Sequence, residues 1–326
     1  MRIGSINSEH VNTFQFIKIL KFTYSYFNRI LQFDQIIPPR LPAESWGEFY
    51  TGQFNVWYTR SMKKNSKNPA LSINGPLLDL IRVNFSETLD FKCYPFSLPL
   101  IKNLKEIQFP TQVTFFVGEN GTGKSTILEA IATKAGFGAE GGSKNINFKT
   151  SQEKTYTGTE LFADQLTLSW NYKPRNGNGY FFRAESFFNI ANYIDQLALN
   201  GGPELAYGPY GGKSLHEQSH GESFLAFFQN RLGNGGFFIF DEPEAALSPQ
   251  RQLSLMIIMR ELCKNPHAQF IIATHSPILL AYPGATIYSC DGDKLSAIAY
   301  KDTHHYNVTK DFLDDPERYL QYLFKD

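Results

Sequence analysis

The segment Gly118–Ser125, with the sequence GENGTGKS, places the tightest constraint on how this chain folds. It fits the pattern G-x-x-x-x-G-K-[ST] and joins a buried-strand pattern at 112–118 to a helical pattern that begins at Ser125. A glycine-rich loop in this position can turn its backbone N–H groups around phosphate oxygens, and the helix start adds positive potential. The segment therefore predicts a strand–loop–helix unit that binds a nucleotide through its phosphates.

Two side chains of this loop have expected roles. Lys124 is expected to meet the β- and γ-phosphates, and the Ser125 hydroxyl is expected to bind Mg²⁺. A second Gly-Lys-Ser occurs at 212–214, but no apolar strand precedes it and no helical pattern follows it. We therefore interpret that second occurrence as an ordinary loop.

A pair of carboxylates follows another apolar strand pattern. Phe237–Phe240 leads directly into Asp241 and Glu242. In open α/β sheets ligands bind beyond the carboxyl ends of the strands, which is where these two side chains would lie. Asp241 is expected to hold Mg²⁺, directly or through water, and Glu242 is expected to polarise the attacking water as a general base.

Two further motifs follow the same logic. His275 comes just after the strand pattern QFIIATHSP, at 269–277, and could contact a γ-phosphate and sense its loss. The segment QSHGESF, at 218–224, offers a hydroxyl, a glycine turn and a carboxylate through Ser219, Gly221 and Glu222. Taken alone it looks like an ordinary helix cap, so its meaning depends on the order of the whole set.

Short segments with strand patterns run along most of the chain, and helical patterns alternate with several of them. The predicted strands are 78–85, 89–98, 112–118, 164–172, 180–186, 237–240 and 269–277. Ser248 and Pro249 suit the N-cap and the first residue of a helix. This alternation predicts an α/β fold with a mainly parallel sheet.

An approximate domain boundary is predicted near residue 72, because residues 37–76 are rich in Pro, Gly, Ser and Asn, a composition typical of loops or a linker. Residues 1–72 carry nine basic and four acidic side chains, although the whole chain has a formal net charge of zero. We interpret this segment as packed on the core with a solvated basic surface, and a basic arm that reaches a partner is the alternative. Residues 301–326 form an amphipathic, aromatic tail in which 308–324 is expected to pack on the body rather than dock a partner.

The cysteine and hydropathy patterns bear on where in the cell the protein is expected. Cys93, Cys263 and Cys290 lack C-x-x-C spacing, which argues against a disulfide framework or a zinc site. No stretch approaches the roughly 18 apolar residues of a membrane helix, and no secretory signal is evident. The expected location is cytoplasmic. The adjacent His304 and His305 are not expected to bind a metal, because neighbouring side chains diverge on most backbones.

The order of the motifs resembles that of the ATP-binding-cassette superfamily: phosphate loop, S-x-G-E, an apolar strand with D-E-P-E, then T-H-S. The resemblance covers about residues 78–300. It looks closest to the branch without transport function, which includes chromosome-maintenance and break-repair ATPases, overcoming-lysogenisation-defect nucleases and stand-alone ATPases. The run DEPEAALSP, at 241–249, is similar to the D-E-P-E-x-x-L-x-P of the last two groups.

The resemblance implies a P-loop domain of the ABC-ATPase type at 73–300, with an antiparallel β part and a helical signature insertion at about 187–235. It implies a homodimer in which the signature of one subunit closes over the ATP and Mg²⁺ held by the other. The implied catalytic residues are Lys124, Glu242 and His275, and the implied metal ligands are Ser125 and Asp241. The implied nucleotide-binding residues are Gly118, Asn120, Gly121, Gly123, Lys124, Ser125 and Thr126, with Ser219, Gly221 and Glu222 acting across the dimer.

The sequence departs from the superfamily pattern at three places. The signature reads His-Gly-Glu where transporters usually carry Gly-Gly-Gln, which weakens a transporter interpretation. Ser248 stands where an aspartate often couples the subunits, and no clear Q-loop glutamine is present, so Glu185 or Ser186 is a substitute candidate.

Three functions remain open. The favoured hypothesis is an ATP-dependent switch of a separate effector, a nuclease or toxin, in anti-phage defence or nucleic-acid metabolism. A DNA-clamping head is the first alternative, although the 95 residues from Lys124 to Ser219 leave no room for a long coiled coil. A transporter motor is the second. Binding of DNA or RNA is left open by the sequence.

Overall fold

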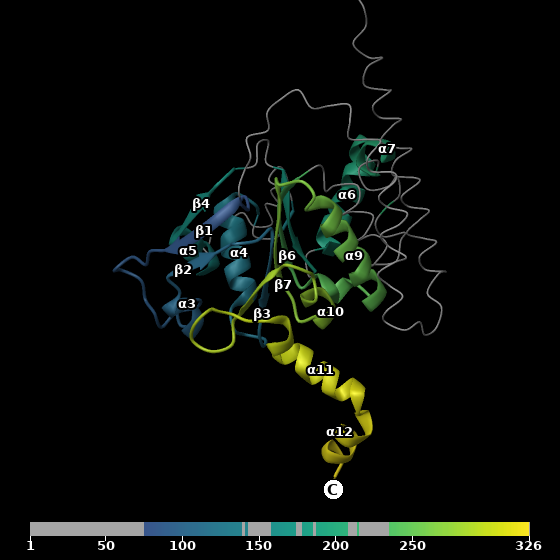
Figure 1. Cartoon of the computed structure of the whole chain (residues 1–326). Helices are drawn as coiled ribbons and strands as arrows, with labels where there is room; N and C mark the ends of the chain where they lie inside the picture. Colours follow the sequence, from purple (N-terminus) through teal and green to yellow (C-terminus); the bar gives the residue numbers. More distant parts are fainter. Residues whose placement is uncertain are drawn as a thin grey trace, which may run out of the picture. The chain divides into compact units, whose positions relative to one another are not determined.

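The computed structural model describes residues 75–138, 141–142, 158–173, 178–184, 187–207, 214 and 235–325, and Figure 1 shows their arrangement. The predicted segment 1–72 and the S-x-G-E signature lie outside the described residues. The domain boundary near residue 72 therefore stays a prediction.

The central sheet has six strands in the order β5-β6-β7-β3-β8-β9. The four pairings from β5 to β8 are parallel, and only β8 and β9 pair antiparallel. The strands are β3 (Val113–Val117), β5 (Gly179–Arg183), β6 (Gly236–Asp241), β7 (Ala268–Ala273), β8 (Thr286–Ser289) and β9 (Ser296–Ala297). This confirms the predicted α/β class with a mainly parallel sheet.

A smaller antiparallel sheet has the order β2-β1-β4, with β1 at Leu78–Val83, β2 at Glu106–Gln108 and β4 at Leu166–Trp170. The antiparallel part is thus confirmed. Gln269, a fully buried residue of β7, joins the two sheets: its Oε1 accepts the Leu78 N–H at 2.7 Å, and its Nε2 donates to the Leu78 carbonyl at 3.0 Å.

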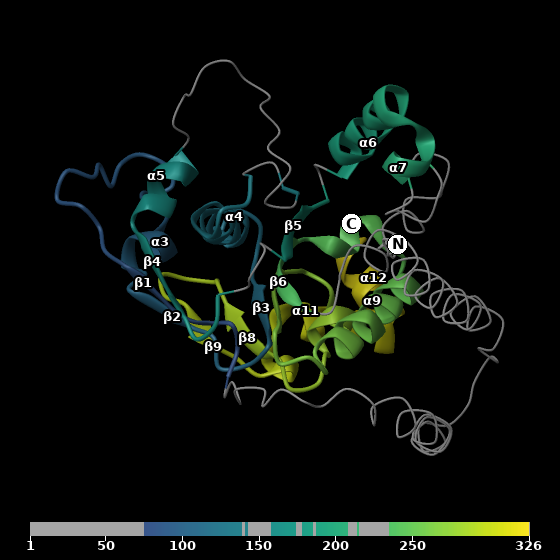
Figure 2. The same cartoon turned by 90° about the horizontal axis from the view of Figure 1, so that it is seen from above.

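Helices cover both faces of the central sheet, which explains why every residue of β3, β6 and β7 is buried (Figure 2). Successive side chains of β6 alternate between two cores. Phe237 and Ile239 pack with α4 (Lys124–Ala135) and the antiparallel sheet, whereas Phe238 and Phe240 pack in the core that includes α9 (Pro249–Leu262) and α10 (Pro277–Leu280). The sheet is therefore held from both sides, and its edges position the connecting loops.

The starts of α4 and α9 follow the sequence expectations to within a residue. Gly123 precedes α4 and Gly136 ends it, both with left-handed backbones at φ 102° and 93°. Ser248 caps α9 by accepting the Arg251 N–H at 3.4 Å, and Pro249 is its first residue. The other helices before the tail are α3 (Pro99–Asn103), α5 (Gly158–Asp164), α6 (Phe187–Gly201), α7 (Pro203–Tyr207) and the 3-10 turns η6 (Pro243–Ala246) and η7 (Tyr300–Asp302).

The strand predicted at 89–98 is wrong, because this segment forms turns that lead into α3. The Asp90 carboxylate accepts the Lys92 N–H at 2.9 Å and bends the chain. Phe91 and Phe96 then pack edge-to-face with each other and with Phe85. The aromatic side chains that suggested a strand are therefore members of a compact cluster between turns.

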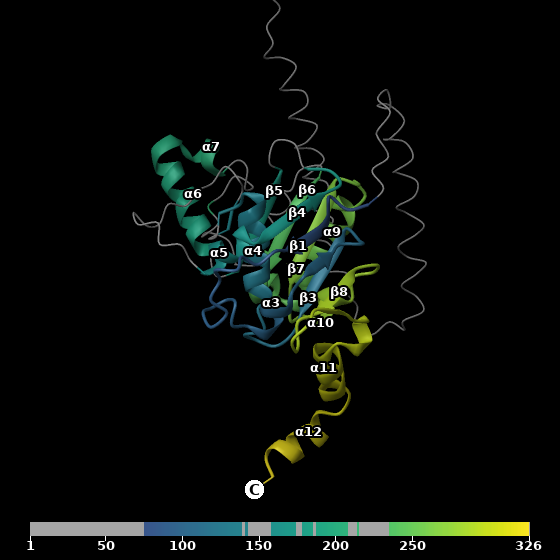
Figure 3. The ribbon, with the colours of Figure 1, turned by 90° about the vertical axis from the view of Figure 1, so that its left-hand side faces the viewer.

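The tail forms two helices, α11 (His304–Asp314) and α12 (Pro316–Leu323), but its expected packing on the body is wrong. Neither helix has a buried residue, and the apolar side chains of Leu313, Tyr322 and Phe324 are all more than half exposed. Figure 3 shows α12 leading away from the sheet. The sequence predicted an amphipathic tail, but an amphipathic pattern does not show which surface its apolar side chains contact. In the part of the chain that the structure describes, no helix is long and apolar enough to cross a membrane.

Candidate functional site

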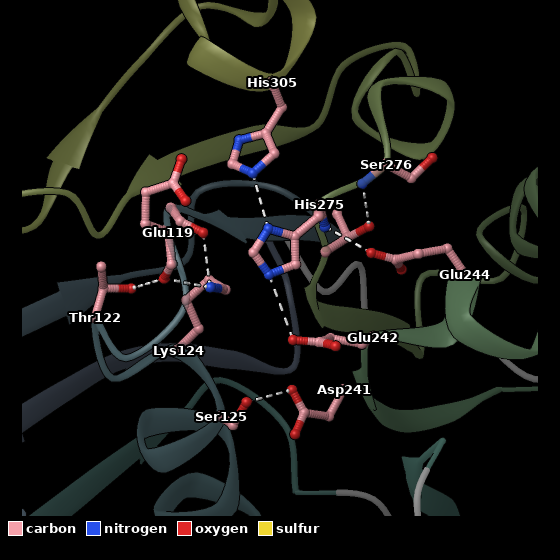
Figure 4. Close-up of polar contacts among 12 residues, drawn as sticks. Glu119, Thr122, Lys124, Ser125, Asp241, Glu242, Glu244, His275, Ser276 and His305 are labelled. Atoms are coloured by element: carbon pink, nitrogen blue, oxygen red, sulfur yellow. Dashed lines mark hydrogen bonds and ion pairs between the residues drawn. The ribbon is translucent and has the colours of Figure 1, made fainter. Parts of the chain in front are cut away.

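The carboxyl ends of β3, β6 and β7 meet at one edge of the central sheet, and three predicted motifs leave the sheet there (Figure 4). The glycine-rich loop follows β3, the Asp241–Glu242 pair ends β6, and His275 follows β7. The parallel register brings Asp241 opposite Ala273, two residues before His275. Segments that are more than a hundred residues apart in sequence are thus assembled into one site.

The loop needs its glycines. Gly118, Gly121 and Gly123 have φ values of 151°, 82° and 102°, a region that other residues rarely adopt. A Cβ at Gly118 would also lie 2.9 Å from Oδ1 of Asp291. That carboxylate accepts the Glu119 N–H at 2.8 Å and so ties the loop to the end of β8. No motif in the sequence marks Asp291, so this contact could not be predicted from local pattern.

Lys124 lies inside the loop, with only 4% of its surface exposed. Its Nζ donates to the carbonyl oxygens of Gly118 at 2.7 Å and of Glu119 at 2.9 Å. Burial lowers the pKa of Lys124, and the nearby Asp241, Glu242, Asp291 and Cys290 act in the opposite direction. The ammonium is therefore desolvated and held by carbonyl oxygens within the loop that is predicted to bind phosphate.

Ser125 and Asp241 come together as the sequence predicted: the Ser125 hydroxyl donates to Asp241 Oδ1 at 3.0 Å. Asp241 is buried, and its other oxygen lies 3.8 Å from Nε of Arg183. Arg183 also pairs with Glu129 at 3.5 Å. A hydroxyl and a carboxylate side by side are hard oxygen donors, which is the ligand type that Mg²⁺ prefers. The residues present therefore fit a magnesium site.

Arg183 was missed by the sequence reading, although it lies in the strand pattern that was expected to supply a Q-loop substitute. It ends β5, directly opposite Asp241 in the parallel register. No local motif marks it, and only the pairing of β5 with β6 brings it to the site. Glu185 and Ser186, the substitutes considered, lie outside the described residues.

Glu242 has an unusual backbone. Its φ is 49° and its ψ is 54°, and within the described ranges it is the sole non-glycine residue with a positive φ. Such a conformation costs roughly 1–3 kcal/mol and is retained where the surroundings enforce it, often at functional sites. Here the Glu242 N–H donates to the Ala273 carbonyl at 3.0 Å, which anchors the turn to β7.

His275 is held on two sides, and its Nε2 lies 3.4 Å from Oε1 of Glu242. Its backbone N–H donates to Oε1 of Glu244 at 2.6 Å. Its ring Nδ1 lies 2.8 Å from Nε2 of His305. Burial raises the pKa of Glu244, opposed mainly by its hydrogen bond from His275. The sequence reading named His275 but neither of these supports.

The remaining predicted residues stand apart from this cluster or outside the described chain. Asn120 is exposed on the loop, and the buried Thr126 pairs its hydroxyl with that of Tyr94 at 2.7 Å. Ser219, Gly221 and Glu222 lie outside the described residues. No group of three metal-ligating side chains was found among the residues described.

Two protein-family models match the chain, and each covers one half of this constellation. A model described as "AAA domain" matches residues 90–192, which include the glycine-rich loop. A model described as "AAA domain, putative AbiEii toxin, Type IV TA system" matches residues 223–281, which include Asp241, Glu242 and His275. These segments are P-loop ATPase domain sequence.

Solved structures resemble this P-loop ATPase chain in fold only. The SMC head domain from Thermotoga maritima is 18% identical with a TM-score of 0.36, and the match covers 68% of this chain and 98% of that one. The cbiO1 subunit from Clostridium perfringens, part of the ABC transporter complex cbiONQ, is 16% identical with a TM-score of 0.40, and the match covers 77% and 100%. None of the curated proteins matches the chain.

Proposed function

We propose that this chain binds ATP with Mg²⁺, hydrolyses it, and uses an ATP-linked homodimer to switch a separate effector protein. The observation that carries the proposal is the contact between Ser125 and Asp241 at 3.0 Å, within the same edge of the sheet as Lys124 and Glu242. A phosphate loop, a pair of hard oxygen ligands and an adjacent carboxylate are the parts that phosphoryl transfer to water requires.

Each part has a chemical task in this proposal. The backbone N–H groups of Gly118–Thr126 and the Lys124 ammonium bind the phosphates, and Ser125 and Asp241 would hold Mg²⁺. When bound, Mg²⁺ neutralises charge on the phosphate oxygens. The Glu242 side chain is 40% exposed, so its carboxylate is free to reach a water and accept its proton. His275, 3.4 Å away, is placed to contact the γ-phosphate.

The dimer follows from the loop's exposure and from the resemblance to cassette ATPases. Glu119, Asn120 and Gly121 are exposed on the rim of the loop. In the proposed dimer Ser219, Gly221 and Glu222 of the second copy close over the nucleotide at this rim. Contacts to the γ-phosphate exist only before hydrolysis, so phosphate release reopens the interface.

The proposed effector is a nuclease or toxin on another chain, acting in anti-phage defence or nucleic-acid metabolism. The family model that matches residues 223–281 of this chain is described as an AAA domain and putative toxin of a type IV toxin–antitoxin system, which supports a setting of this kind but does not itself point to a second chain.

Two variants with matched controls test the ATPase assignment through ATP binding and phosphate release. Lys124→Ala is expected to weaken ATP binding roughly 10- to 100-fold, because charge-assisted hydrogen bonds are lost. Lys134→Ala, at an exposed site on the same helix, is its control. Glu242→Gln is expected to keep ATP binding and to slow hydrolysis roughly 100-fold. Its control, Glu261→Gln at a partly exposed position of α9, is expected to hydrolyse ATP at the wild-type rate. If Lys124→Ala and Glu242→Gln both hydrolyse ATP at the wild-type rate, the assignment is wrong.

A further inference from the structure

His305 lies next to the candidate site at the carboxyl ends of β3, β6 and β7, although it comes from the C-terminal tail. It belongs to the first turn of α11, where the buried Thr303 caps the helix by accepting the Tyr306 N–H at 3.4 Å. The Thr303 hydroxyl also donates to the Tyr300 carbonyl at 2.8 Å. The start of α11 is therefore anchored, and Figure 4 shows the His305 ring pointing at His275, on the side opposite Glu242.

The two histidines and Glu242 form a chain of contacts. Nε2 of His305 lies 2.8 Å from Nδ1 of His275, and Nε2 of His275 lies 3.4 Å from Oε1 of Glu242. If both rings are neutral, the contact between them holds one proton, carried either by Nε2 of His305 or by Nδ1 of His275. In the first case His275 carries its own proton on Nε2, which faces Glu242; in the second case that Nε2 is bare. Burial and the nearby His275 and Lys124 lower the pKa of His305, while Glu119 and Asp291 oppose this effect.

One of the two arrangements is much less favourable. If His275 carried the proton on Nδ1, its bare Nε2 lone pair would face the Glu242 carboxylate. His305 would then carry its proton on Nδ1, a buried atom with no hydrogen-bond partner in the described part of the chain. Nε2 of His275 is also buried without a hydrogen bond there, but it lies 3.4 Å from a carboxylate oxygen, toward which an N–H is favourable and a lone pair is not. A buried N–H without a hydrogen bond is unfavourable, because the loss of its contact with water is not compensated. In the other arrangement His305 donates through Nε2, and His275 presents an N–H on Nε2 toward Glu242.

We propose that His305 is a positioning residue for ATP hydrolysis: its Nε2–H donates to Nδ1 of His275 and fixes the tautomer and ring orientation that present the Nε2–H of His275 to the reaction site. This inference rests on the proposed ATPase function for its kinetic consequence, but not for its tautomer. His305 does not touch the nucleotide itself and acts through His275.

Through His305, the C-terminal tail is linked to the candidate site. The same helix that places His305 continues into the exposed apolar residues of α11 and α12, among them Phe312 and Leu313. A movement of α11 would separate the two rings and release His275. The rate of hydrolysis is therefore sensitive to the position of α11.

The first test is structural and needs no activity. Long-range ¹⁵N–¹H spectra of the full chain, labelled at its seven histidines and assigned with single-histidine variants, report the ring tautomers. We expect His275 to carry its proton on Nε2 in the wild type and to become a mixture of tautomers in His305→Ala. A wild-type His275 protonated on Nδ1, or a tautomer unchanged in His305→Ala, overturns the proposal.

The second test is steady-state ATPase kinetics of the full chain. His305→Ala is expected to lower kcat roughly 10-fold, the size of effect seen when an orienting partner of a functional histidine is removed, with KM within about twofold. His305→Gln, which keeps an N–H donor near the Nε2 position, is expected to recover most of the loss. His304→Ala, at the exposed neighbouring position, is the matched control and is expected to behave as wild type.

The outcomes separate this inference from the proposed function. An active wild type with His305→Ala unchanged in kcat contradicts the inference alone. A loss in His305→Ala that His305→Gln does not restore, while both variants melt at the wild-type temperature, also contradicts it. A wild type whose phosphate release is unaffected by Lys124→Ala contradicts the ATPase function itself, whatever His305 does.

Discussion

Helix α4 offers a paired test of the phosphate loop, because a left-handed glycine flanks each of its ends. Gly123 precedes the helix at φ 102° and ψ 10°, and Gly136 follows it at φ 93° and ψ 21°. Alanine in a left-handed conformation costs roughly 1–2 kcal/mol. Gly123→Ala and Gly136→Ala are therefore expected to lower the free energy of unfolding by similar amounts, measured by urea denaturation with an unchanged m-value.

Neighbouring atoms should add little to the loss of stability at either position. A Cβ at Gly136 would have no neighbour within 4 Å, and one at Gly123 would meet the flexible end of Leu98 at 3.3 Å. The two variants should differ in their affinity for ATP. Gly123→Ala displaces the loop that carries the phosphate-binding N–H groups, so a loss of at least about tenfold, or about 1.4 kcal/mol, is expected. Gly136→Ala should bind ATP as the wild type does.

Titration with a fluorescent ATP analogue, displaced by ATP, measures both affinities. Equal ATP affinities for the two variants at matched stability would refute the reasoning, because the Gly123 end of α4 would then have no special role. If Gly123→Ala alone lost much more stability than Gly136→Ala, the expected loss of roughly 1–2 kcal/mol would be wrong for Gly123, because Leu98 would then be unable to move aside.

Three other changes have clear expected results. Removal of Mg²⁺ with EDTA should abolish phosphate release, and added Mg²⁺ should restore it, because Ser125 and Asp241 are its only proposed protein ligands; full activity in EDTA would contradict this. Gln269→Met should destabilise the fold by roughly 2–4 kcal/mol in urea denaturation, because two buried hydrogen bonds to β1 are lost, and the exposed Gln108→Met should not; equal effects would argue against the link between the sheets. Thiol labelling of the native chain should modify the exposed Cys93 well before Cys290, which is buried and whose pKa is raised to about 12; the reverse order would contradict the burial.

The candidate site at the carboxyl ends of β3, β6 and β7 was largely predictable because its main parts are local motifs. The glycine-rich loop needs glycine at defined positions and lies between a buried strand and a helix, so the pattern states its own structural context. The pair Asp241–Glu242 follows a fully apolar strand, and His275 follows the next one. Parallel pairing of these strands then brings all three motifs to one edge without further information.

The residues that support this edge were not predictable from local pattern. Asp291 reaches Glu119 across 172 residues, and His305 reaches His275 across 30. Arg183 depends on the register between β5 and β6. Each of these contacts is set by tertiary packing, and each residue looks ordinary in its own segment.

The two errors in the fold have a common cause. Residues 89–98 have the aromatic content of a strand, but edge-to-face packing of Phe91 and Phe96 stabilises turns instead. In the tail the amphipathic pattern was recognised, but that pattern does not encode the surface that its apolar side chains contact. Sequence pattern indicates which side chains avoid water, and packing decides where they do so.

The central claim is that ATP closes a dimer whose opening requires hydrolysis at Glu242. The most direct measurement is the mass of Glu242→Gln by light scattering, with and without ATP–Mg²⁺ and with double-stranded DNA added. The account expects a monomer of 37.1 kDa to double in mass with ATP–Mg²⁺ and to be indifferent to DNA. A mass that never changes with ATP, or a dimer that forms only when DNA is present, would contradict it.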